Sequence, residues 1–181
     1  MTDENKKNEI EQRLLELPIV QYAWLPASEI EFSERARYIC ETECPRYGKS
    51  WACPPGVGTV EECREICRGY DEVFVFTTIA EVQDIENMEE TLATRSGHEE
   101  VTRQIRDIFQ EFSFQTLAMS GDSCAICGEC AYPDAPCRHP DQMISCIEGY
   151  GVLVPLLAEK AGIVFDNGSN IVTWFGSVLL R

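Results

Sequence analysis

The chain has 181 residues, of which 44% are hydrophobic and 25% are charged, values that are ordinary for a soluble globular domain. Its formal net charge of −16 should repel nucleic acid and anionic membrane surfaces, so we exclude both as partners. The N-terminal segment lacks a hydrophobic signal core, and no apolar run approaches the roughly 20 residues that span a bilayer. We therefore expect a cytoplasmic protein, in which ten cysteines indicate metal or redox chemistry rather than disulfides.

The first half of the chain combines helical and extended patterns around a cysteine-rich segment. In chain order, the predicted elements are a helix at 4–16, extended segments at 21–25 and 29–32, a structured loop at 38–58, a helix at 59–68 and a buried strand at 72–80. The loop prediction rests on a Cys, Pro and Gly composition without helix or strand period. The helix prediction rests on Thr59 and Glu62, which form an S/T-x-x-E capping box.

The second half follows the same pattern around a second cysteine-rich loop. The predicted elements are helices at 84–94 and 97–112, a strand at 114–119, a loop at 121–140, helices at 141–148 and 155–161, and a strand at 170–180. This order predicts an α+β or α/β fold, with a small sheet, packed helices and two cysteine-rich metal-binding loops. We expect a single domain over residues 1–181, with residues 1–28 as an N-terminal helical and extended appendage.

The second loop holds Cys124, Cys127 and Cys130 at three-residue intervals, followed by Cys137. A tight loop can turn every third sulfur inward while the intervening amides hydrogen-bond to sulfide, and bacterial ferredoxins use the same first three positions. This spacing predicts a [4Fe–4S] cluster. Zinc is the alternative, although its sites usually pair two Cys-x2-Cys knuckles across a longer spacer. Disulfides between such close neighbours would be strained.

The first loop holds Cys40, Cys44 and Cys53 at a less diagnostic spacing. Cys44 and Cys53 each precede a proline, which favours an extended backbone at both positions. A stiff segment of this kind can hold a thiolate and exclude water, so we predict a second metal site here. The alternative is that these are buried cysteines in a turn-rich loop.

The remaining cysteines and the two histidines have weaker patterns. Cys63 and Cys67 share one stripe of a predicted helix, where packing as small hydrophobes is expected and a fourth ligand position is the alternative. Cys146 lies in the helix predicted after the second loop and is also expected to pack, although one helical turn would bring it near the cluster. His98 is expected at a solvated helix start, and His139 lies close to Cys137.

The segments RYICETECPRYGKSWACPP and CAICGECAYPDAPCRHP, with IEGYGVLV further on, resemble a family of predicted metal-binding proteins of anaerobic bacteria and archaea. The family is catalogued as domain of unknown function 2284, and the resemblance runs from about Glu29 to the C-terminus. The matching positions are Arg37, Cys40, Cys44, Tyr47, Gly48, Cys53, Pro54, Pro55, Cys124, Cys127, Cys130, Cys137, Arg138 and Pro140. Tyr150 and Leu153 stand where the family often has a cysteine and an aspartate. The resemblance implies metal binding, with iron–sulfur as the expected type, and no established reaction.

Seven matching cysteines are one short of two four-cysteine clusters. Either Cys124, Cys127, Cys130 and Cys137 hold one cluster while the first loop holds another with one open iron, or the ligands cross between the loops. We expect an iron–sulfur protein, with two [4Fe–4S] clusters, that transfers electrons to a redox partner protein. The alternatives are an enzyme that binds a small-molecule substrate at the open iron and a zinc-binding interaction protein.

Overall fold

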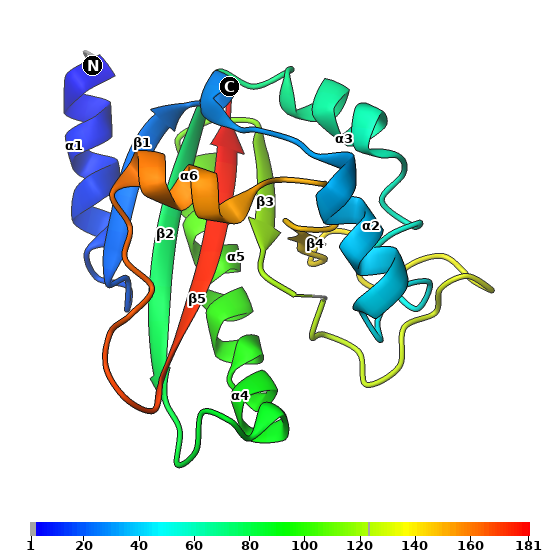
Figure 1. The fold of residues 1–181 in the computed structure, drawn as a ribbon. Helices are drawn as coiled ribbons and strands as arrows, with labels where there is room; N and C mark the ends of the chain where they lie inside the picture. Colours follow the sequence, from blue (N-terminus) through cyan, green and yellow to red (C-terminus); the bar gives the residue numbers. More distant parts are fainter. Residues whose placement is uncertain (1–2, 123) are drawn as a thin grey trace.

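The computed structural model describes residues 3–122 and 124–181, and its described part contains a five-stranded mixed sheet between two layers of helices (Figure 1). The strands are β1 (Gln21–Pro26), β2 (Glu72–Glu81), β3 (Thr116–Ser120), β4 (Ser145–Cys146) and β5 (Ile171–Leu180), in the spatial order β1-β2-β5-β3-β4. The pairing of β3 with β4 is parallel, and the pairings of β1 with β2, β2 with β5 and β5 with β3 are antiparallel. The result is a mixed α/β fold, within the class that the sequence predicts.

The helices cover both faces of this sheet. They are α1 (Asp3–Leu14), α2 (Glu34–Glu43), α3 (Val60–Cys67), α4 (Met88–Ala93), α5 (Arg95–Glu111) and α6 (Val154–Ala161), with a short 3-10 helix, η1 (Ala27–Glu29), after β1. Side chains alternate along β2, so Phe74 and Phe76 pack with α1 and α5, whereas Val73 and Val75 pack with α3 and α6. A strand buried on both faces explains the continuous apolar run in the sequence.

Several sequence predictions are confirmed. Thr59 caps α3 through the predicted capping box, with reciprocal hydrogen bonds to Glu62. The strands expected at 72–80 and 170–180 are β2 and β5, which pair along their whole length. The helix expected at 4–16 corresponds to α1, whose Ile10 and Leu14 are buried on the α5 side of the sheet, and the extended segment expected at 21–25 is β1, which pairs with β2.

Two predictions about the cysteine-rich segments are wrong. Residues 141–148 are not a helix, because Ser145 and Cys146 pair with the edge of β3 as the two-residue strand β4. Residues 38–58 are not all loop, because α2 extends through Cys40 to Glu43. The Ser33 side chain accepts a hydrogen bond from the Arg35 amide and caps the start of α2. This capping residue precedes the segment whose Cys, Pro and Gly composition predicted a loop.

The prediction that His98 lies at a solvated helix start is also wrong. The His98 ring is buried in the first turns of α5, where Nδ1 lies 2.8 Å from Thr78 Oγ1. The ring stacks against Phe76 and Trp174, with centroid distances of 5.3 and 6.3 Å. Burial lowers the pKa of His98 to about 4.

Within the described residues, the helices are too short or too polar to cross a bilayer.

We predict that the His98→Gln variant loses part of the acid sensitivity of the wild type. The unfolded chain takes up a proton on His98 near pH 6.5, whereas the folded chain resists protonation until about pH 4. The free energy of unfolding of the wild type should therefore fall, relative to that of His98→Gln, as the pH is lowered from 6.5 to about 4. Urea unfolding across this range measures the difference, and parallel pH profiles would contradict the buried neutral imidazole.

Candidate metal centre

The cysteines of the two loops line two separate cavities near the β4 edge of the sheet. In Figure 1 the second loop runs beside α2 and β4, and the strand order places this edge opposite β1. Cys40, Cys44 and Cys53, the first cysteine group, line a cavity of about 450 Å³. The second cysteine group lines a much smaller cavity of about 20 Å³, and its members are Cys124, Cys127, Cys130 and Cys137. All ten cysteines lie in the described part of the chain, and no disulfide is formed among them.

The first group is placed by a helix and the turn that follows it. Cys40 lies in α2, and Cys44 is the C-cap of this helix, with its amide donating to the Cys40 carbonyl at 3.3 Å. Pro45 cannot continue the helix, so the chain turns back toward Cys53. Cys53 is buried within two further turns, in which its amide bonds to Ser50 O at 3.2 Å and its carbonyl to Val57 N at 3.2 Å.

Arg37 fastens this part of α2 to the rest of the protein. Its buried guanidinium lies one turn before Cys40 and donates to the carbonyl of Gly58 at 2.7 Å and to that of Gly149. Burial raises the pKa of the Cys40 thiol, and the neighbouring Cys44 adds to this effect, whereas the charge of Arg37 opposes it. Arg37 therefore both positions the helix and supplies a positive charge beside a group of thiols.

The second group is partly buried, and hydrogen-bond donors surround Cys130. Burial raises the pKa of the Cys130 thiol, but hydrogen bonds from the Tyr132 and Trp51 backbone and from the Ser50 side chain outweigh it, so that the net pKa is lowered. The loop begins beside α5, where the buried Glu99 carboxylate accepts from the Ala125 amide at 2.9 and 3.0 Å. Donors aimed at sulfur favour a thiolate, the form that binds metal.

Trp51 connects the first loop to the second. Its indole Nε1 donates to the Ala135 carbonyl at 2.9 Å, and its ring meets Tyr132 edge-on with a centroid distance of 4.8 Å. Ser50 and Trp51 line the cavity of the second group, whereas Cys53, two residues further on, lines the cavity of the first. The two cysteine groups are therefore neighbours that share one short segment of chain.

Residues outside the two cysteine groups also line these cavities. Cys146 and Glu148 line the first cavity, and His139 lines the second. Asp122, also at the first cavity, pairs with Arg46 at 3.1 Å and with Arg95 of α5. The helix predicted at 141–148 would bring Cys146 near the second cysteine group, whereas the pairing of β4 with β3 brings it to the first cavity.

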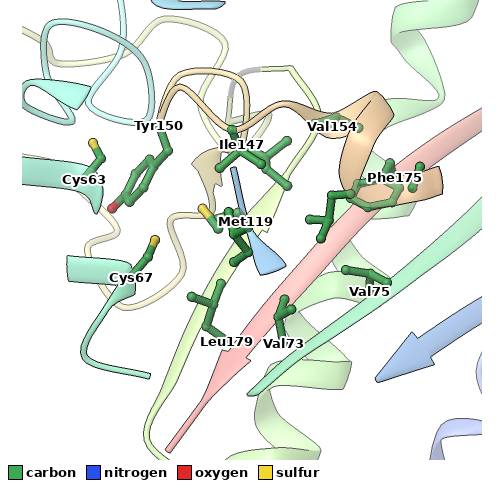
Figure 2. Close-up of a cluster of buried hydrophobic side chains, with 14 of the residues drawn as sticks. Cys63, Cys67, Val73, Val75, Met119, Ile147, Tyr150, Val154, Phe175 and Leu179 are labelled. Atoms are coloured by element: carbon green, nitrogen blue, oxygen red, sulfur yellow. The ribbon is translucent and has the colours of Figure 1, made fainter. Parts of the chain in front are cut away.

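Cys63 and Cys67 lie elsewhere, in the hydrophobic core under α3. Figure 2 shows both side chains near Tyr150, within a cluster that includes Met119 and Leu179. Burial raises the pKa of the Cys67 thiol to about 12, and the Cys63 thiol donates to the Val57 carbonyl at 3.4 Å. Both cysteines are placed as small packing residues, as their helical stripe predicts.

Thiols gathered in two cavities are the donor set of soft metal ions and of iron–sulfur clusters. No three His, Cys, Asp or Glu side chains of residues 3–122 and 124–181 are arranged so that they could hold a single ion. The family model described as predicted metal-binding protein (DUF2284) matches residues 23–180, and the chain belongs to this family. No curated protein and no solved structure matches the chain.

We predict that Cys63→Ala leaves the metal content unchanged and lowers the free energy of unfolding by about 1 kcal/mol, the scale for loss of a small buried group. The reason is that Cys63 is fully buried in the core and does not line either cysteine cavity. Metal analysis and urea unfolding of the anaerobically purified variant provide the two measurements. Loss of about half the metal, the share of one of two equal sites, would make Cys63 a ligand instead.

Proposed function

We propose that this protein binds two [4Fe–4S] clusters and transfers electrons to a partner protein or redox enzyme. The observation that carries the proposal is the segment from Ser50 to Cys53, which takes part in both cysteine cavities. Two clusters held at these cavities would be separated by little more than Trp51 and Ala52. Clusters this close can pass an electron between them, and a cluster supplies a one-electron couple whose potential depends on its surroundings.

The second group supports the arrangement in which each loop holds its own cluster. All four of its cysteines face one small cavity, and Cys53 of the first loop does not line it. The N–H and O–H groups around Cys130 would hydrogen-bond to a bound thiolate, which stabilises its negative charge and raises the reduction potential of the attached cluster. The chain's own residues thus set the charge balance of this site.

Exposure distinguishes the two sites. The four cysteines of the second group are all partly exposed, whereas in the first group Cys40 and Cys44 are partly exposed and Cys53 is buried. An electron would therefore enter or leave most directly through the second group. Because the protein carries a net charge of −16, a partner with a basic face would be steered toward it, most strongly at low salt.

We predict that Cys127→Ala empties the second site and leaves the first. Loss of one thiolate exposes an iron to water and oxygen, so about half of the iron and sulfide should be lost, together with half of the visible absorption. Electron paramagnetic resonance (EPR) of the reduced wild type should show two magnetically coupled clusters, and that of Cys127→Ala a single uncoupled one.

Cys63→Ala is the matched control, since it removes a buried thiol that does not line either cysteine cavity. It should keep the coupled spectrum of the wild type. A Cys127→Ala protein that retains its full iron content and absorption would overturn the ligand assignment of the second group. Two full clusters without magnetic coupling in the wild type would overturn the close spacing on which electron transfer depends.

A further inference from the structure

Cys146 differs from the other buried cysteines outside the first and second groups. Cys63 and Cys67 belong to the hydrophobic cluster under α3, whereas Cys146 is also buried but belongs to neither hydrophobic cluster of the described residues. It lines the cavity of about 450 Å³ together with Cys40, Cys44 and Cys53. Its position is therefore that of a fourth thiol at the first site.

The backbone holds Cys146 next to Cys53. Ser120 of β3 is the register partner of Cys146, and the Cys146 amide donates to the Ala52 carbonyl at 2.9 Å. Because Ala52 directly precedes Cys53, this bond places the two cysteines side by side, and their side chains are hydrogen-bonded to each other. A sheet edge and a turn, each with its own hydrogen bonds, thus present two adjacent sulfur atoms.

The Cys146 sulfur is held by hydrogen bonds on two sides. Its Sγ accepts a hydrogen bond from the Gly149 amide at 3.3 Å, a bond that a thiolate would retain and strengthen. The Cys146 thiol donates a hydrogen bond to Glu148 Oε2, with 3.3 Å between Sγ and this oxygen. Metal binding releases the thiol proton and replaces it with the metal.

The turn after Cys146 is fixed to both segments that carry the first group. A Cβ at Gly149 would lie 3.0 Å from Pro54 Cδ and 3.2 Å from Cys146 Cβ, so this turn packs closely on the residue that follows Cys53. The Gly149 carbonyl accepts a hydrogen bond from Arg37, which lies one turn of α2 before Cys40. The turn that follows Cys146 is therefore attached both to α2 and to the Cys53 turn.

We infer that Cys146 is the fourth protein ligand of the metal group at the first site. The inference rests on the proposed function and changes the first site from three thiolates with one open iron to a closed set of four. A closed set loses its iron slowly on oxidation and has no exchangeable position for an added ligand. The first site then acts in electron transfer rather than in binding a substrate at iron.

The experiment isolates the first site in a Cys127→Ala background, in which the second site is empty. Cys127→Ala is compared with Cys127→Ala/Cys146→Ala and Cys127→Ala/Cys146→Ser, and Cys127→Ala/Cys67→Ala is the control for loss of a buried thiol. Each protein is reconstituted anaerobically with iron and sulfide, oxidised mildly and measured by EPR, with and without cyanide. Far-UV circular dichroism identifies any variant that does not fold, and the nearly isosteric Cys146→Ser then carries the comparison.

We expect no three-iron signal and no response to cyanide from Cys127→Ala or from the Cys67 control. The Cys146 variants should lose the remaining cluster, or show a three-iron signal that disappears when ferrous iron and reductant are returned. A three-iron signal from Cys127→Ala itself would overturn the inference, and so would a Cys146 variant that behaves like the Cys67 control. Wild-type protein that takes up no iron and sulfide would instead overturn the proposed function, so the two failures are distinguishable.

Discussion

The hydrogen bond from the Cys146 amide to the Ala52 carbonyl is the contact on which the arrangement of both cysteine groups depends. It attaches the first loop to the β4 edge of the sheet and so fixes the depth at which Cys53 is buried. One residue earlier, Trp51 reaches in the other direction and bonds to the second loop through Ala135. A segment of four residues, 50–53, is thereby held between the sheet edge and the second loop, with one cysteine group on each side.

The rest of the scaffold limits the movement of this segment. Arg37 joins α2 to the turn after Cys146, and Asp122 joins the first loop to α5 through Arg46 and Arg95. The central strands β2 and β5 are packed on both faces and pair over ten residues each, which gives the sheet edge a rigid base. Both segments that carry the first cysteine group are therefore attached to a sheet edge with a packed base.

Local patterns predicted the parts of this fold that local interactions determine. The capping box of α3 and the apolar runs of β2 and β5 were readable because each depends on neighbours in sequence. The second cysteine group was readable for the same reason, since its spacing places three sulfurs within one loop. Membership of a predicted metal-binding family, expected from the cysteine motifs, is confirmed over residues 23–180.

The features that sequence could not predict are made by distant segments. β4 has two residues and no periodicity of its own, so only its pairing with β3 distinguishes it from the helix expected at 141–148. His98 lies at a helix start, a place that is usually solvated, but Thr78 of β2 and Trp174 of β5 enclose its ring. Cys146 joins the first cavity through the same β4 pairing, so its spacing from Cys53 in sequence carries no signal.

The measurement that tests the account most directly is the iron, zinc and acid-labile sulfide content of anaerobically purified wild-type protein. Two [4Fe–4S] clusters require about eight irons and about eight sulfides per chain, with little zinc. One or two zinc ions per chain without sulfide would contradict the account, because thiolates alone complete a structural zinc site and leave no electron to transfer.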